Sequence, residues 1–230
     1  MMIITKHQEN PTLTSDSLPT LLVLGDSISL QYGPHLESYL ADRCVYRTKQ
    51  AEGDAFADLD LPQGKNVGDS RMLLAYLRAL DEQNTLHADF ILMNCGLHDI
   101  KVDPSTGQRQ VDITAYRENL LSIVDLLQQR SIPLAWMRTT PVVDAVHNAK
   151  ASFHRFAADN EAYIAVADDV MAQRQVPLID LHSFTRSLGD DEQLFCDHVH
   201  YHAPIRQLQA AYLAGWFIAH TESMFPLRKP

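Results

Sequence analysis

Residues 21–29 read Leu-Leu-Val-Leu-Gly-Asp-Ser-Ile-Ser, and this stretch decides the expected fold. Its four leading apolar residues lie between Pro19 and Gly25 and predict a strand buried on both faces, as in a parallel sheet. Gly25 allows a sharp turn, which places Ser27 at the carboxyl end of the strand, where open α/β sheets bind ligands. On these residues alone, Ser27 is as readily a helix cap as a nucleophile.

Strand and helix patterns alternate along the rest of the chain. Apolar runs predict strands over residues 20–24, 44–46, 89–95, 132–137 and 176–180. Periodic apolar residues predict a short helix opening at Gly33-Pro34 and helices over residues 70–83, 113–130, 148–174 (irregular near His154) and 203–220. This alternation, with long connections, requires right-handed crossovers and a parallel sheet. We expect a three-layer α/β/α, flavodoxin-like fold with a central five-stranded parallel sheet.

The chain divides into a polar N-terminal arm, residues 1–18, and a single domain, residues 19–230. A domain of this length buries a substantial core. Specificity in such folds lies in the loops at the carboxyl ends of the strands. These loops are expected at residues 49–67, 101–112, 141–150 and 182–196, and their polar content favours a polar substrate.

The composition excludes several classes of protein. A formal net charge of -10 argues against nucleic acid or an anionic membrane as the main partner. No apolar run approaches the roughly 18 residues of a membrane span, and residues 1–11 lack the apolar segment of a secretory signal. The three cysteines, Cys44, Cys95 and Cys196, are widely spaced and fit a reducing compartment. We therefore expect a cytoplasmic protein.

Two familiar catalytic or cofactor motifs are missing from the sequence. No Gly-x-Gly-x-x-Gly follows the first expected strand, so a dinucleotide-binding fold is unsupported. No Gly-x-Ser-x-Gly occurs either, which argues against an α/β-hydrolase built on that turn. We expect no cofactor.

Residues 197–200 read Asp-His-Val-His and lie in a polar loop before the last expected helix. An aspartate three residues before a histidine can accept the imidazole Nδ1–H, which leaves Nε2 as a base. Together with Ser27, this pattern supplies a nucleophile, a base and an orienting carboxylate. The alternative is a solvated loop of acidic and histidine residues.

A metal site is a further alternative for this loop. His198, His200 and His202 alternate, so an extended segment would turn all three imidazoles to one side, and Asp197 would add an oxygen ligand. No other cluster of histidine and cysteine completes such a site. We therefore expect no bound metal.

Four short segments, in chain order, resemble the blocks of the GDSL/SGNH hydrolase superfamily. They are Leu24-Gly25-Asp26-Ser27, Asn66-Val67-Gly68-Asp69-Ser70, Gly96-Leu97-His98-Asp99 and Asp197-His198-Val199-His200. Each segment is weak evidence alone, but their order and their positions on the expected elements together give a specific match. The resemblance covers about residues 20–220.

The resemblance implies a serine esterase or lipase on a flavodoxin-like fold. Ser27 would be the nucleophile, His200 the general base and Asp197 the partner of that base. The oxyanion hole would use the backbone amides of Ser27 and Gly68 and a side chain from the third segment.

A second Gly-Asp-Ser occurs at residues 68–70, but it follows polar residues rather than a buried strand. Ser70 is therefore expected to be the N-cap of the helix that follows. That role would leave the Gly68 N–H free to point at a ligand. The alternative for Gly68 is an ordinary turn glycine.

The sequence departs from the family at His98, where the family usually has asparagine. A neutral histidine donates one N–H, so the oxyanion role can survive the change. The alternative is a structural histidine that is hydrogen-bonded to Asp99. Asn94 is a less favoured substitute donor, because it lies inside the expected strand.

Two further residues are candidates for substrate contacts. Arg138 ends the fourth expected strand and would meet an anionic group, although a surface salt bridge is the favoured alternative. Asp26 is better explained as a buried carboxylate that stabilises the turn.

His147 and His154 are expected to be solvated, and Cys95 and Cys196 are expected to be buried. We expect no catalytic role for Cys95 or Cys196.

These observations predict a serine esterase that cleaves a small acyl ester through an acyl-enzyme. The expected partner is a small-molecule ester, with an acetylated carbohydrate as the candidate suggested by the family. An acyltransferase that uses the same residues is the first alternative. A non-catalytic, hydrolase-like binding module is the second.

Overall fold

A computed structural model describes residues 18–225, so nearly all of the expected N-terminal arm, residues 1–18, lies outside the described residues. Five parallel strands form one sheet in the order β2-β1-β3-β4-β5. Their bounds are Thr20–Leu24 for β1, Val45–Thr48 for β2, Phe90–Met93 for β3, Leu134–Met137 for β4 and Leu178–Ile179 for β5. The predicted five-stranded parallel sheet is confirmed.

The apolar content of each strand follows its place in the sheet. The central strands β3 and β4 are buried at every position, as is β1 after its first residue. β2 alternates between exposed and half-buried residues because it forms an edge. Helices cover both faces of the central strands, which is why these read as continuous apolar runs.

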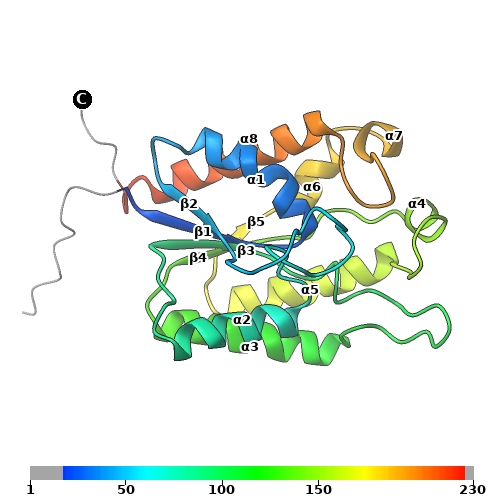
Figure 1. Cartoon of the computed structure of the whole chain (residues 1–230), viewed down its shortest axis with the longest axis horizontal. Helices are drawn as coiled ribbons and strands as arrows, with labels where there is room; N and C mark the ends of the chain where they lie inside the picture. The colour runs from blue at the N-terminus through cyan, green and yellow to red at the C-terminus, as the bar shows by residue number, and fades with distance from the viewer. Residues whose placement is uncertain (1–17, 226–230) are drawn as a thin grey trace, which may run out of the picture.

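The helices lie in two layers, one on each face of the sheet (Figure 1). Their bounds are Ser27–Tyr39 for α1, Ser70–Glu82 for α2, Ile113–Gln129 for α3, Asp144–Asn148 for α4, Ala157–Gln173 for α5, Leu181–Arg186 for α6, Asp191–Leu194 for α7 and Ala203–Thr221 for α8. Helices α1 and α8 pack together on one face, and α2, α3 and α5 cover the other (Figure 1). The three-layer α/β/α fold is therefore confirmed.

Three helix boundaries differ from those predicted. Helix α1 begins at Ser27 and contains Pro34 in its interior, because the Asp26 side chain already caps it at the end of β1. The helical stretch predicted over residues 148–174 is broken into α4 and α5. The backbone of His154 pairs with Val102 in the break. The expected loop at residues 182–196 contains α7 and most of α6.

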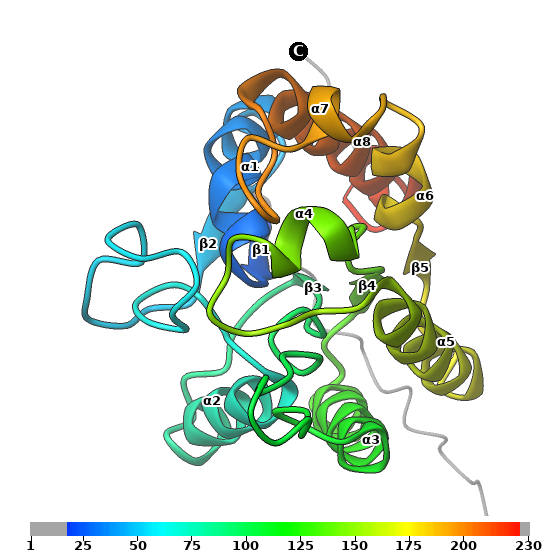
Figure 2. The same ribbon diagram turned by 90° about the vertical axis from the view of Figure 1, so that its right-hand side faces the viewer.

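The carboxyl ends of the strands meet at one edge, which faces the viewer in Figure 2. At this edge the loop from α7 to α8 descends between α1 and α4 (Figure 2). Among the described residues, no helix is long and apolar enough to cross a membrane. The fold thus gathers α1, α4 and this loop around the end of β1.

Candidate active site

The turn between β1 and α1 holds Ser27 at the sheet edge. The Asp26 carboxylate accepts the Ile28 N–H at 2.9 Å, and the Ser29 hydroxyl donates to the Asp26 carbonyl at 2.7 Å. Ser27 is the first residue of α1 and is buried apart from a small exposed fraction, 6%. The same capping interaction therefore starts the helix and fixes the direction of the serine.

The second part of the site is a tight turn, residues 195–202, between α7 and α8. The backbones of Phe195 and Tyr201 pair across it, and the Cys196 N–H donates to the His200 carbonyl at 2.9 Å. Inside the turn, Asp197 Oδ1 accepts the N–H groups of Val199 and His200, both at 2.8 Å. Asp197 thus accepts the backbone N–H groups of its own turn. This folds the chain so that the side chains of Asp197 and His200, three residues apart, lie next to each other.

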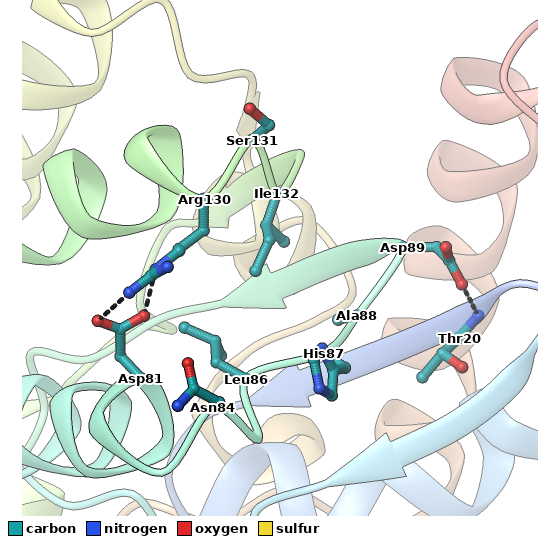
Figure 3. Close-up of a pocket in the computed structure, with 10 residues that line it drawn as sticks. All are labelled: Thr20, Asp81, Asn84, Leu86, His87, Ala88, Asp89, Arg130, Ser131 and Ile132. Atoms are coloured by element: carbon teal, nitrogen blue, oxygen red, sulfur yellow. Dashed lines mark hydrogen bonds and ion pairs between the residues drawn. The ribbon is translucent and has the colours of Figure 1, made fainter. Parts of the chain in front are cut away.

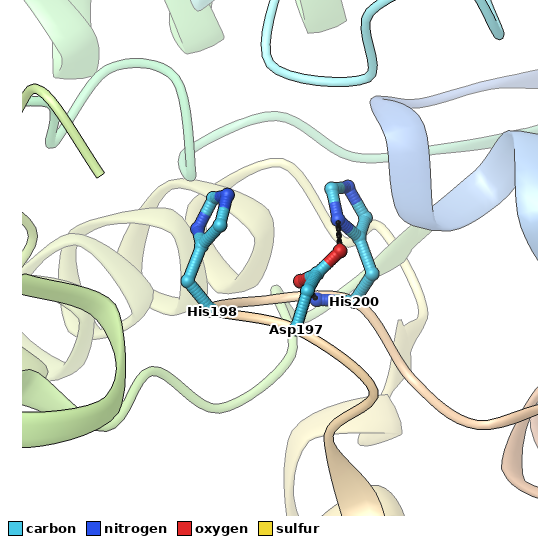
Figure 4. Close-up of side chains that lie close together, drawn as sticks. All are labelled: Asp197, His198 and His200. Atoms are coloured by element: carbon cyan, nitrogen blue, oxygen red, sulfur yellow. Dashed lines mark hydrogen bonds and ion pairs between the residues drawn. The ribbon is translucent and has the colours of Figure 1, made fainter. Parts of the chain in front are cut away.

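The turn brings Asp197, His200 and Ser27 into one hydrogen-bonded row. His200 Nδ1 lies 2.7 Å from Asp197 Oδ2 (Figure 4). The other ring nitrogen, Nε2, lies 2.9 Å from Ser27 Oγ. A carboxylate can only accept, so Nδ1 carries the proton and Nε2 is left to accept the serine hydroxyl proton.

The charge state of Asp197 supports this arrangement. Partial burial acts to raise its pKa, but hydrogen bonds from the His200 side chain and from the Val199 and His200 amides outweigh it. The pKa of Asp197 is therefore held well below its usual value. The carboxylate stays ionised at neutral pH, where it fixes the tautomer of His200.

His98 follows β3 at the carboxyl edge of the sheet and is buried, with 1% exposure. Burial, with the charges of Lys101 and Arg155, holds the pKa of His98 well below its usual value, so the ring is neutral. The alternative of a His98–Asp99 hydrogen bond is wrong, because Asp99 instead accepts the Ser70 N–H through both oxygens, at 2.9 and 3.1 Å. The buried Nδ1 of His98 has no partner among the described residues.

The hydrogen bonding of Gly68 and the capping role of Ser70 both differ from the prediction. The Gly68 N–H is not free, since it donates to Asn66 Oδ1 at 2.9 Å. Asp69, rather than Ser70, is the N-cap of α2 and accepts the N–H groups of Arg71 and Met72. The sequence alone could not separate the two caps, because aspartate and serine are equally good N-cap residues.

The family model for GDSL-like lipases and acylhydrolases matches residues 23–207. The chain belongs to the GDSL-like lipase/acylhydrolase family. That match spans all four segments that resemble the family, from Ser27 to His200. No curated protein matches the chain.

Solved structures of GDSL-family and related esterases share the fold. A lipase/acylhydrolase from Enterococcus faecalis is 16% identical, with a TM-score of 0.67 over 93% of this chain and 100% of that one. An acetyl xylan esterase, AlAXEase, is 16% identical, with a TM-score of 0.63 over 86% of this chain and 98% of that one. The psychrotrophic esterase EstA from Pseudoalteromonas is 17% identical, with a TM-score of 0.60 over 89% and 99%. At these identities the likeness shows the fold alone.

The two candidates for substrate contact, Arg138 and Asp26, both bind groups of the protein itself. Arg138 lies between Asp168 and Asp180, with nitrogen–oxygen distances of 2.8 and 2.7 Å. The expected contact of Arg138 with an anionic substrate is therefore not supported, because its guanidinium is committed to two carboxylates. Asp26 is 1% exposed and caps α1, and burial raises its pKa. It stabilises the turn that carries Ser27.

Several polar residues at this edge carried no clear signal in the sequence. His147, expected to be solvated, is fully buried in α4, and its Nδ1 lies 2.9 Å from His198 Nδ1. Arg155 is 2% exposed, and its Nε donates to the Leu97 carbonyl at 2.6 Å. Burial lowers the pKa of Arg155 to about 10, so it remains charged at neutral pH. Of these three residues, only His198 could have been found from a sequence motif, because it lies within the Asp-His-Val-His segment.

The two thiols beside the site differ in exposure. Cys95 is fully buried at the end of β3, as expected. Cys196 is exposed, which contradicts the expectation of burial. It lies on the outside of the 195–202 turn, where its Sγ contacts the Tyr201 carbonyl.

Asp197, His198 and His200 offer one ligand atom each within 4.8 Å of one another (Figure 4). His202, the fourth residue of the metal alternative, is exposed at the start of α8 and is not part of this group. A cation at these atoms would compete with the 2.7 Å bond between Asp197 and His200. The arrangement therefore favours an Asp–His pair over a metal centre.

A cavity of about 440 Å³ lies away from these residues, at the amino-terminal edge of the sheet (Figure 3). Two pairs of its polar groups bind each other. Arg130 pairs with Asp81, and the Thr20 N–H donates to Asp89 at 2.7 Å. It contains no nucleophile paired with a base, so it is not the candidate active site.

Gly25 is closely surrounded at the turn before Ser27. A β-carbon there would lie 2.7 Å from Asn94 Oδ1 and 2.8 Å from the Ser29 side chain. We expect Gly25→Ala to cost about 1–3 kcal/mol in the free energy of unfolding, as overpacking does. Esterase activity should fall with it, because Ser29 helps to fix the turn. Denaturant unfolding and steady-state rates measure the two effects.

Gly215 in α8 is the matched control, because a β-carbon there meets no atom within 4 Å. Gly215→Ala should leave activity unchanged and should not destabilise the protein, since alanine favours the helix. Wild-type stability and activity in Gly25→Ala would show that the turn has more room than the structure gives it.

Proposed function

We propose that the protein is a serine ester hydrolase in which Ser27, His200 and Asp197 carry the reaction. The observation that supports this most directly is the row of hydrogen bonds at 2.7 and 2.9 Å that joins the three side chains. The row needs no rearrangement to move the serine proton. Asp197 orients the base and stabilises the imidazolium that forms.

The reaction follows a double displacement. His200 Nε2 takes the Ser27 proton as Oγ attacks the ester carbonyl, and a tetrahedral oxyanion forms. The imidazolium then protonates the leaving alcohol, which leaves an acyl group on Ser27. Water, activated by His200 in turn, attacks the acyl carbonyl and releases the acid, and the proton returns to Ser27.

Two donors are available for the oxyanion. The Ser27 backbone N–H has no acceptor among the described residues, and it lies at the start of α1. The neutral ring of His98 supplies one further N–H. The Gly68 N–H contributes only if the Asn66 side chain releases it. We therefore assign the oxyanion hole to Ser27 and His98, with Gly68 as a third donor once ligand binding displaces Asn66.

A small acyl ester is the proposed substrate, with acetyl esters of carbohydrates as the first class to test. AlAXEase, which shares the fold, is an acetyl xylan esterase. The net charge of -10 speaks against nucleic acid as a partner. We keep the cytoplasm as the proposed compartment, on the grounds of three free cysteines.

Covalent labelling tests the nucleophile. EstA is described as inhibited by monoethylphosphonate, and a fluorophosphonate probe uses the same phosphorus chemistry. We expect the probe to add one phosphonyl group at Ser27, located by mass spectrometry of the peptide, and to abolish hydrolysis of p-nitrophenyl acetate. Ser27→Ala should remain unlabelled. Ser70→Ala is the control and should label normally. The backbone N–H of Ser70 donates to Asp99, and the proposed reaction gives Ser70 no part.

Two outcomes would contradict the proposal. The first is no labelling of the wild type under conditions that label a known serine esterase. The second is equal turnover of p-nitrophenyl acetate by the wild type and Ser27→Ala, which would favour a binding module.

A further inference from the structure

A second row of polar side chains lies beside Asp197 and His200, and the proposed reaction does not use it. His198 Nε2 lies 3.0 Å from Asp60 Oδ2. His198 Nδ1, on the other side of the ring, lies 2.9 Å from His147 Nδ1. The three residues come from the loop before α2, from the 195–202 turn and from α4, so the row joins segments up to 138 positions apart.

The donor and acceptor roles in this row follow from its chemistry. An ionised Asp60 can only accept, so His198 Nε2 carries a proton. In neutral His198, Nδ1 then accepts the Nδ1–H of His147. Burial and the charge of Arg155 lower the pKa of His147 to about 3, so that ring is neutral. With both rings neutral, every group in the row thus has a donor or acceptor role that its neighbour matches.

The row is well placed to hold the turn that carries the proposed base. His198 lies between Asp197 and His200 in sequence, and its ring centroid is 5.8 Å from that of His200. The side chain of Asp197 is 41% exposed and has no bond outside the turn among the described residues. His198 is only 13% exposed and is bonded on both sides. His198 is therefore the firmer anchor of the two.

The row also extends toward His98. The Nε2 of His147 and the Nη1 of Arg155 are both buried and have no partner among the described residues. The positive charge of Arg155 helps to lower the pKa of His147, so the two side chains lie close together. Arg155 in turn holds the Leu97 carbonyl, next to His98.

We propose that Asp60 and His147 are positioning residues that clamp His198 and, through it, hold His200 in line with Ser27. This inference rests on the proposed function. It gives Asp60 a part in catalysis, although its side chain takes no part in the reaction itself. An error of about 1 Å in the position of a catalytic group can cost about 100-fold in rate.

The test compares Asp60→Ala with Asp60→Asn on p-nitrophenyl acetate. Asp60→Ala removes the partner of His198, and we expect kcat to fall about 10-fold to 100-fold with KM within about twofold. The amide of Asp60→Asn can accept from or donate to Nε2, so it should keep more than half of the wild-type kcat. Asp54→Ala is the control, because Asp54 lies in the same loop and its side chain accepts only the nearby Phe56 N–H. It should leave kcat unchanged.

The division between kcat and KM is needed because Asp60 also lines a cavity of about 720 Å³ with Lys101 and Phe153. A residue that merely contacts substrate in that cavity would raise KM and leave kcat unchanged, and this result would overturn the proposal. Equal losses of kcat in Asp60→Ala and Asp60→Asn would overturn it too, because a lost charge rather than a lost hydrogen bond would then be the cause.

A second readout needs no turnover. The proton shared between His200 Nδ1 and Asp197 should give a low-field NMR resonance in the wild type and in Asp60→Asn. We expect it to broaden or shift in Asp60→Ala, with thermal unfolding showing that the variant remains folded. An unchanged resonance in a folded Asp60→Ala would overturn the proposal. If Ser27→Ala kept full turnover, the proposed function would fail, whereas this comparison would still decide whether Asp60 positions His200.

Discussion

Replacing His200 with alanine should lower kcat/KM for p-nitrophenyl acetate by about 10⁴-fold or more, because loss of the base disables the nucleophile as well. The 2.9 Å contact with Ser27 and the 2.7 Å contact with Asp197 both disappear. Labelling of Ser27 by a fluorophosphonate should slow by a similar factor, since the same proton transfer activates Oγ. Stopped assays at high enzyme concentration give access to the residual rate.

His202→Ala is the matched control for this variant. His202 is an exposed histidine two residues away, at the start of α8, and its side chain does not cap the helix. Its replacement should leave kcat/KM within about twofold, as expected for a surface site. If His200→Ala kept more than a tenth of the wild-type rate, His200 could not be the base.

The second large effect is expected at His98. His98→Ala should lower kcat by about 10²–10³-fold, the usual cost of losing one oxyanion donor. His98→Asn should recover most of that loss, because the side-chain amide also supplies an N–H and asparagine is the usual residue of the family here. The comparison uses kcat for p-nitrophenyl acetate, with far-UV circular dichroism to check the fold.

His154→Ala controls for the loss of an imidazole in the same region. His154 joins the structure through its backbone, which pairs with Val102. Its side chain should be dispensable. A His98→Ala variant with wild-type kcat would mean that the Ser27 and Gly68 amides bind the oxyanion without help.

The fold was open to prediction because its signals are local. Buried parallel strands read as apolar runs, and the runs at β1, β3 and β4 are clear in the sequence. The turn at residues 195–202 was equally accessible, because Asp197 and His200 bond within one turn. Ser27 could be paired with them only through the rule that parallel strands present their ligands at one edge.

The features that could not be predicted depend on contacts between residues far apart in sequence, or on neighbouring side chains that could bind the same group. Nothing local distinguishes the buried His147 from a solvated histidine, since its partner His198 is 51 positions away. The amide of Gly68 was expected to be free because the nearby Asn66 side chain was not counted as an acceptor. Arg138 could have met a substrate group or a carboxylate of the protein, and only the folded structure shows that Asp168 and Asp180, 30 and 42 positions away, both reach it.

The start of α1 at Ser27 has an electrostatic consequence. The aligned peptide dipoles of this 13-residue helix place about half a positive charge at its first turn, where the proposed nucleophile Ser27 lies. An anion that forms on Ser27 therefore meets a favourable field supplied by the backbone, whichever side chain occupies position 98. Because Ser27 is itself the first helical residue, this field acts at the serine for as long as α1 begins at that residue.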